Sequence, residues 1–155
     1  MMLRERIARR IDALFGITPV YAHCDVPCGI YDPHGAQIAA KTVYTMIKKA
    51  TDLPKPGPSA PLQEDIEYRN TFIRMVQTKE AHAHICKQEL TILWSDYFKP
   101  EHLALIPDLH DTFWKTVKLC SYNKQHMDLA KAQELIDAVN EIAQLFQKAE
   151  AAKKK

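Results

Sequence analysis

The sequence predicts an all-α protein, an antiparallel four-helix bundle preceded by a leader helix and a short cysteine-containing hook. Three observations favour this fold. Apolar residues recur at spacings of three and four along most of the 155-residue chain, as they do on one face of a helix. Only four glycines are present, which disfavours a loop-rich β fold. Clusters of proline, which interrupts helices, separate the periodic stretches.

The composition is that of a one-domain globular protein, with 46% hydrophobic and 26% charged residues. A formal charge of +2 gives no strong field for nucleic acid, and no apolar run approaches the roughly 20 residues that span a membrane. The four cysteines do not form the dense pattern of a secreted disulfide scaffold, so we expect a reducing, cytoplasmic setting. Two of them, Cys86 and Cys120, fall on apolar helix faces and are expected to pack in the core.

Residues 1–22 are predicted to be a leader that is removed on maturation. Apolar residues at helical spacing alternate there with arginines, which is typical of a short amphipathic helix. Arg9, Arg10 and Asp12 break the apolar stretch that a secretory signal needs, although the residues that end at Ala22 have the small-residue pattern of a signal-peptidase site. We therefore interpret the leader as a maturation device rather than an export signal.

Residues 23–33, the hook, place one imidazole and two thiols within six positions, at His23, Cys24 and Cys28. Cleavage between Ala22 and His23 would give His23 a free α-amine. That amine, the Cys24 backbone amide and the Cys24 thiolate would form two fused five-membered chelate rings on one metal, and the Cys28 thiolate would complete a plane. A square plane of two nitrogens and two sulfurs is typical of Ni(II) or Cu(II) rather than zinc.

The bundle is predicted to span residues 34–150, followed by a basic tail over 151–155. A first helix begins near His34, and a proline-rich linker ends at Pro61. A long second helix runs from about 62 to 98 and stops before Pro100, a third opens at Pro107 with a break within 121–126, and a fourth follows. The apolar faces comprise Ile38, Val43, Met46, Ile47 and Ala50 in the first helix, Val76, Ala83, Leu90 and Tyr97 in the second, Leu109, Phe113, Val117 and Cys120 in the third, and Leu129, Ala132, Ile136, Val139, Ala143 and Phe146 in the fourth.

Two separate blocks resemble the nickel-containing superoxide dismutases. The first is His-Cys-Asp-x-Pro-Cys-Gly-x-Tyr-Asp-Pro over residues 23–33, and the second is Leu-Trp-Ser-Asp-Tyr-Phe-Lys-Pro over 93–100. The first motif is highly specific, because few other uses of His and Cys need this spacing. The resemblance implies conversion of superoxide to oxygen and hydrogen peroxide by Ni(II)/Ni(III) cycling, with one nickel ion per protomer. It also implies a homohexamer of four-helix bundles, made as precursors that a maturation protease trims to expose the histidine.

The resemblance further implies roles for individual residues. The His23 imidazole would be an axial ligand, and Tyr31 and Tyr97 would sit over the metal and limit access to small anions and water. Asp25 would help to order the hook through its backbone. Lys99 lies in the second block and could attract the anionic substrate.

The chain also departs from this family. In one branch, a glutamate in the first helix orients the metal-binding histidine, and the matching position here is Ala39. An arginine of the long helix is also replaced, by Gln77 or His82. Two alternative functions remain open from the residues alone. One is a non-enzymatic nickel or copper carrier, and the other is a thiol-redox protein that uses Cys24 and Cys28 as a dithiol.

Overall fold

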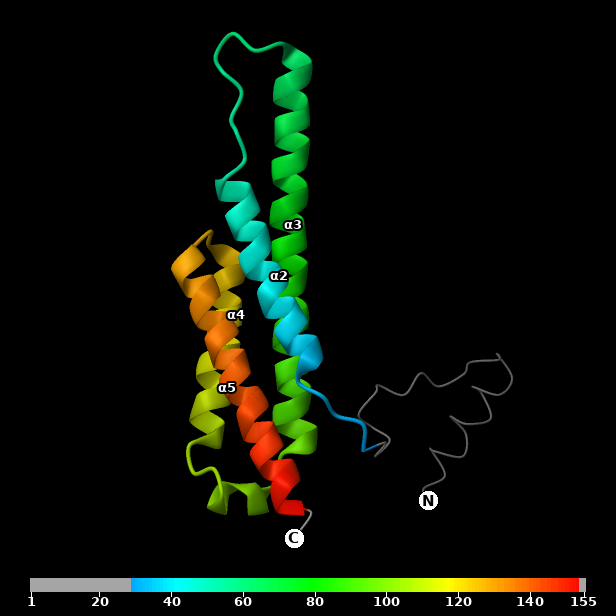
Figure 1. Ribbon diagram of the computed structural model, residues 1–155, viewed down its shortest axis with the longest axis vertical. Helices are drawn as coiled ribbons and strands as arrows, with labels where there is room; N and C mark the ends of the chain where they lie inside the picture. Colours follow the sequence, from blue (N-terminus) through cyan, green and yellow to red (C-terminus); the bar gives the residue numbers. More distant parts are fainter. Residues whose placement is uncertain (1–28, 154–155) are drawn as a thin grey trace, which may run out of the picture. The chain divides into compact units, whose positions relative to one another are not determined.

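The computed structural model describes residues 29–153, and the leader and hook residues 23–28 lie outside this range. Its elements are α2 (His34–Thr51), α3 (Leu62–Ile92), the π-helical turn η1 (Leu93–Tyr97), the 3-10 helix η2 (Pro100–Ala104), α4 (Leu109–Gln125) and α5 (Leu129–Lys153). Successive α-helices run in opposite directions, with α2 and α4 each packed against both α3 and α5 (Figure 1). The predicted antiparallel four-helix bundle is confirmed. Within the described range, no helix is both long and apolar enough to cross a membrane.

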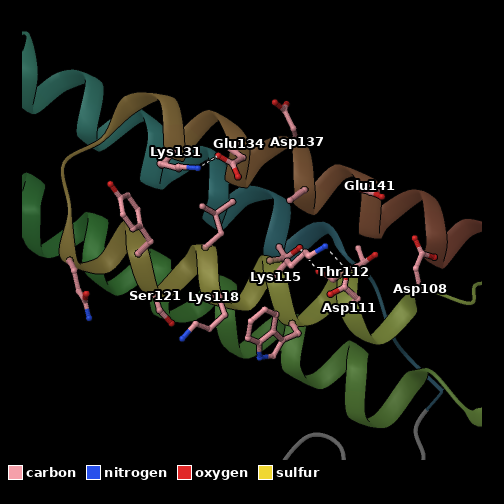
Figure 2. Close-up of a pocket in the computed structure, with 16 residues that line it drawn as sticks. Asp108, Asp111, Thr112, Lys115, Lys118, Ser121, Lys131, Glu134, Asp137 and Glu141 are labelled. Carbon is pink, nitrogen blue, oxygen red and sulfur yellow. Dashed lines mark hydrogen bonds and ion pairs between the residues drawn. The ribbon is translucent and has the colours of Figure 1, made fainter.

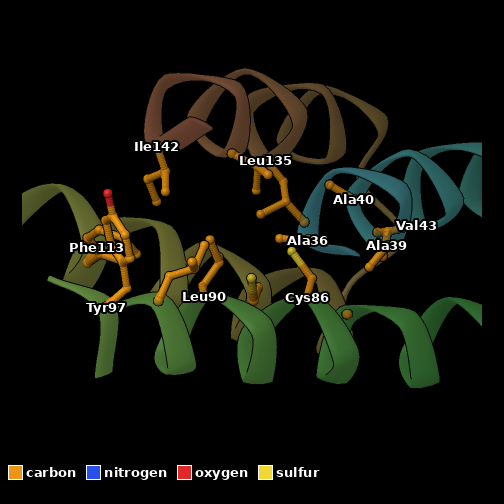
Figure 3. Close-up of a cluster of buried hydrophobic side chains, with 14 of the residues drawn as sticks. Ala36, Ala39, Ala40, Val43, Cys86, Leu90, Tyr97, Phe113, Leu135 and Ile142 are labelled. Atoms are coloured by element: carbon orange, nitrogen blue, oxygen red, sulfur yellow. The ribbon is translucent and has the colours of Figure 1, made fainter. Parts of the chain in front are cut away.

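The core lies between the four helices and combines small side chains on α2 with large ones on its neighbours. Ala36, Ala39 and Ala40 form the first part of the buried face of α2, where α3 and α5 can approach it closely, and Val43 and Ile47 continue this face. Leu90 of α3 and Leu135 of α5 fill the space that these alanines leave (Figure 3). Small and large residues that face each other pack to high density, which gives the helices one defined arrangement.

The two cysteines outside the hook pack as the sequence indicated. Cys86 of α3 and Cys120 of α4 are fully buried free thiols within the same core cluster. A hydrogen bond with the Cys120 thiol, which contributes most, and burial together hold the pKa of Cys86 well above its usual range. Cys86 therefore stays protonated and acts as an apolar core residue.

The long helix ends earlier than the sequence predicted. Its α-helical part stops at Ile92, and the next five residues form η1 instead of continuing to residue 98. Phe98 is extended, and its N–H donates to the Leu93 carbonyl at 3.1 Å, one residue further back than in an α-helix. This wider turn allows Tyr97 and Phe98, which are adjacent in the sequence, both to be buried.

The third helix continues further than predicted. The sequence indicated a break within 121–126, but α4 runs to Gln125. Lys79 of α3 stabilises this end, because its buried ammonium donates to the carbonyl oxygens of Lys124 at 2.7 Å and of His126 at 3.3 Å. Burial lowers the pKa of Lys79, but the two carbonyls replace its lost hydration. A contact from a distant part of the chain thus sets where α4 ends.

Two smaller predictions were also wrong. The third helix begins at Leu109 rather than at Pro107. Ile38, which was assigned to the apolar face of the first helix, is 52% exposed. Residues 151–153, which belong to the predicted tail, form the exposed last residues of α5.

Replacement of Leu90 by alanine should lower the free energy of unfolding by about 2–5 kcal/mol, because it removes a fully buried side chain and leaves a cavity. Ile73→Ala on the same helix is the matched control, since Ile73 is 53% exposed, and its effect should stay within about 1 kcal/mol. Chemical denaturation followed by circular dichroism measures both. Equal losses in the two variants would contradict the assignment of the core.

Candidate functional site

The described part of the hook begins with Gly29, directly after Cys28. Gly29 has a φ of 69°, in the left-handed region where side chains other than glycine are strained. No atom of the described residues lies within 4 Å of the position that a Cβ would take here, so among these residues the need for glycine is conformational rather than steric. Three residues later, the Asp32 carboxylate accepts a hydrogen bond of 2.7 Å from the backbone N–H of His34 and holds the start of α2.

The structure brings the two sequence blocks together through a pair of tyrosines. The rings of Tyr31 and Tyr97 meet edge to face, with centroids 5.6 Å apart and planes at 60°. Tyr31 follows the hook cysteines closely in the sequence, whereas Tyr97 ends η1. The other residues predicted for the hook site and its cleavage point lie outside the described residues, and these are Ala22, His23, Cys24, Asp25 and Cys28.

Tyr97 is only 4% exposed and lies at the centre of an aromatic cluster. The ring centroid of Phe146 of α5 is 4.4 Å from that of Tyr97, and Phe98 packs against Tyr97 at 4.8 Å and 90°. His102 of η2 stacks on it at 5.8 Å and 11°. Aromatic pairs in such arrangements add stabilisation beyond the burial of area. Tyr97 is therefore fixed by residues from separate parts of the chain.

The Tyr97 hydroxyl is engaged by the last turns of α5. It donates a hydrogen bond of 2.6 Å to Oε1 of Glu150. Lys153 donates to the same oxygen at 2.6 Å, and its Nζ lies 4.3 Å from the centroid of the Tyr97 ring. Burial, and then the hydrogen bond to the Glu150 carboxylate, raise the pKa of Tyr97. The phenol therefore keeps its proton at neutral and moderately alkaline pH.

Lys99 follows the tyrosine cluster at the start of η2. Lys99 is exposed, and its backbone N–H donates to Nδ1 of the buried His102 at 3.0 Å. Because Nδ1 accepts this hydrogen bond, a neutral imidazole carries its proton on Nε2. His102 thus connects the backbone at Lys99 to the ring of Tyr97.

The positions where the chain departs from the family pattern hold no equivalent charged group. Ala39 is buried in the core and supplies no carboxylate. Gln77 of α3 is exposed and carries no charge. His82 is half-buried, and its Nδ1–H donates to the carbonyl of Thr78 in its own helix at 2.9 Å. None of the three replaces the carboxylate or the guanidinium of the family pattern.

A different carboxylate lies next to the start of α2. Oε2 of Glu89 is 3.2 Å from the position that a Cβ of Gly35 would take, so a larger residue there would have to displace this side chain. The first turn of a helix favours negative charge, because its backbone N–H groups lack partners within the helix. Glu89 therefore stabilises the point at which the hook joins the bundle.

Sequence reasoning missed Glu150, Lys153, His102 and Glu89. The only signal for the first two is an acidic and a basic residue three positions apart near the end of the last helix. Such pairs are common on exposed helix faces, and the pattern does not indicate a tyrosine partner.

A groove of about 970 Å³ lies between α4 and α5, and none of its lining residues belongs to the tyrosine cluster (Figure 2). Side chains of both charge signs line it, including an ion pair between Lys115 and Asp111 at 2.6 Å. Trp114, which is 55% exposed, also lines it. Within residues 29–153, no three or more His, Cys, Asp or Glu side chains gather in an arrangement that could hold a metal ion. The metal prediction therefore depends on the hook.

A four-helix bundle in which a histidine and two cysteines precede a contacting pair of tyrosines is typical of a small helical metalloenzyme. Comparison with known proteins identifies its family. The family model for nickel-containing superoxide dismutase matches residues 18–150. The nickel superoxide dismutases of Streptomyces seoulensis and Streptomyces coelicolor are each 36% identical over 127 residues, which cover 82% of this chain and 87% of the relative.

Solved structures agree with the sequence comparison. The native nickel superoxide dismutase structure at 1.30 Å superposes with a TM-score of 0.68 and 34% identity, over 83% of this chain and 99% of that one. A structure of the enzyme with the nickel ligation of the oxidised state gives a TM-score of 0.68 and 35% identity, with the same coverage. The chain belongs to the nickel-containing superoxide dismutase family. It is an oxidoreductase that acts on superoxide and uses nickel as its cofactor.

Replacement of Gly29 by alanine should weaken nickel binding by roughly 5- to 30-fold, because a left-handed conformation costs a side chain about 1–2 kcal/mol. Gly57→Ala is the matched control, since its φ is not positive and no atom lies within 4 Å of the position that its Cβ would take. Competition with a chelator measures nickel affinity, and thermal unfolding should show the same bundle stability in both variants. Equal nickel affinity in the two variants would contradict the conformational role of Gly29.

Proposed function

We propose that nickel is bound by the hook, through the thiolates of Cys24 and Cys28, the Cys24 backbone nitrogen and the α-amine and imidazole of His23. The donor set fits nickel, because anionic sulfur and amide nitrogen donate charge strongly and favour square-planar coordination. The observation that carries the proposal is the contact between Tyr31 and Tyr97, whose ring centroids are 5.6 Å apart. It connects the segment that follows the hook cysteines to the second sequence block.

When bound, nickel supplies the one-electron redox chemistry that superoxide dismutation needs. The protein controls access to the metal and supplies a positive charge near it. Tyr31 and Tyr97 limit the approach to small species, and the buried Tyr97 phenol remains protonated. Lys99 is exposed two residues further on, where an ammonium attracts an anionic substrate and raises its encounter rate. Asp25 orders the hook through its backbone.

The same donor set requires a processing step. A histidine inside the chain has a peptide nitrogen and offers no α-amine to a metal. A maturation protease would therefore cut between Ala22 and His23 and so activate the site. The leader would keep the precursor from binding nickel in its final geometry until that cleavage occurs.

The purified native protein should begin at His23 and contain about one nickel per protomer, because the α-amine that this cleavage exposes would be one of the groups that hold nickel. Intact mass, N-terminal sequencing and metal analysis together check this expectation. A chain that still carries the leader and dismutates superoxide at the full rate would refute the proposed site.

Variants of the cysteines provide the control for this experiment. Cys24→Ser and Cys28→Ser should each lose nickel and dismutase activity without loss of helicity, because thiolate is replaced by a weaker donor outside the bundle. Cys120→Ala removes a thiol that is buried in the core, and it should retain nickel and activity. Retained activity in either hook variant would reject the assignment of that ligand.

We also propose that the protein assembles into homohexamers and resides in the cytoplasm. Exposed Trp114 and the groove of mixed charge between α4 and α5 provide a surface suited to a second copy, since opposite charges can pair across a symmetric contact. Free thiols in the core and thiolate ligands both suit a reducing compartment.

Analytical ultracentrifugation should give a mass of six protomers for the matured protein. Trp114→Glu should shift this mass downwards, because it places an extra charge within the proposed contact, while circular dichroism remains unchanged. Trp114→Phe is the matched control. A monomer at all concentrations would refute the assembly, and cell fractionation tests the location.

A further inference from the structure

The last turns of α5 contact Tyr97 of the second sequence block. Glu150 accepts a hydrogen bond of 2.6 Å from the Tyr97 hydroxyl, and Lys153 donates to the same carboxylate oxygen at 2.6 Å. The Lys153 ammonium also lies over the Tyr97 ring, at 4.3 Å from its centroid. Neither residue belongs to the hook or to the block that contains Tyr97. The contact is therefore a separate feature that the proposed metal site does not explain.

A phenol has one proton and two lone pairs. In this structure the proton is directed at a carboxylate, in a hydrogen bond whose short length is typical of a charged acceptor. Tyr97 can then interact with a further group only through its oxygen, as an acceptor. A protonated species such as water or hydrogen peroxide can donate to that oxygen, whereas the superoxide anion obtains no hydrogen bond from it.

We propose that Glu150, held by Lys153, is a positioning residue for superoxide dismutation. It fixes the orientation of the Tyr97 ring, and it accepts the hydrogen bond that the phenol proton donates. The inference rests on the proposed function, in which Tyr97 lines the site. It goes beyond that function by assigning the charge and orientation of Tyr97 to a residue at the far end of the sequence. Tyr97 then acts as an acceptor that favours the protonated product and water over the anionic substrate.

Within residues 29–153, the charged and titratable groups that face Tyr97 come from three parts of the chain. Tyr31 approaches from the segment before α2, His102 stacks from η2, and Glu150 and Lys153 lie on α5. Of these, Glu150 brings the negative charge, which disfavours phenolate. Its removal should therefore lower the pKa of Tyr97, although burial of the ring still raises it.

The test uses matured, nickel-loaded protein in four forms: wild type, Tyr97→Phe, Glu150→Gln and Asp52→Asn. Glutamine has nearly the shape of glutamate and can accept a hydrogen bond from the phenol, but it carries no charge. The Glu150 side chain is 40% exposed, so this variant should fold normally. Asp52→Asn is the matched control, because Asp52 also pairs with a lysine one helical turn away, Lys48, and lies outside the tyrosine cluster and the groove between α4 and α5.

Two readouts are recorded across alkaline pH. Ultraviolet absorbance follows ionisation of the tyrosines, and the step that is missing in Tyr97→Phe belongs to Tyr97. Steady-state dismutation gives kcat as a function of pH. In Glu150→Gln, both the Tyr97 step and the alkaline loss of kcat should move down by about one pH unit, and in Asp52→Asn neither should move.

The proposal is overturned if Glu150→Gln matches Asp52→Asn in both readouts. A shift of the Tyr97 step with no shift in kcat would also overturn it, because Glu150 would then act on Tyr97 without acting on the reaction. Failure of the proposed function has a different signature. In that case Tyr97→Phe would retain wild-type kcat at every pH, whatever the absorbance of Glu150→Gln shows.

Discussion

The chain must bury two consecutive aromatic residues, Tyr97 and Phe98, which a regular α-helix would direct about 100° apart. The π turn η1 meets this constraint, since its wider geometry lets the chain leave the helix at Phe98 while Tyr97 faces the core. Once Tyr97 is placed there, Tyr31, η2 and α5 all pack against it. The surroundings of the site therefore depend on how one helix ends.

The packed core of the bundle and the residues that bear on function lie in different parts of the molecule. Its centre is a cluster of aliphatic and alanine side chains, while the residues that bear on function lie where α3 and α5 end (Figure 1). The proline-rich linker between α2 and α3 lies at the opposite end of the bundle. Such an arrangement allows the core to keep its layout at 36% identity to curated relatives, because many apolar residues satisfy the same periodicity.

The helices could be predicted because a helix that is buried on one face has apolar residues at spacings of three and four. Leu90 and Cys86 follow this spacing, and both are buried in the core. The end of α4 could not be predicted, since it depends on a lysine that lies far away in the sequence. The hydrogen bond between Tyr97 and Glu150 leaves no pattern for the same reason. For metal ligation, by contrast, the sequence carries the signal. The spacing of the hook residues indicates it directly, and it remains a prediction because His23, Cys24 and Cys28 lie outside the described residues.

The π turn also sets how the segment from Leu93 to Pro100 responds to a change of length. An i→i+5 turn holds one residue more than an α-helical turn, so η1 accommodates one extra residue within the helix. If the same residues formed a regular α-helix, the side chains that follow would turn by about 100° about the helix axis, and Tyr97 and Phe98 could not both keep their partners. Loss of one residue together with the π turn would instead leave the direction of the following side chains nearly unchanged. In comparisons among homologues, a one-residue gap in this short segment is therefore compatible with an intact site, whereas an α-helical segment of the same length is not.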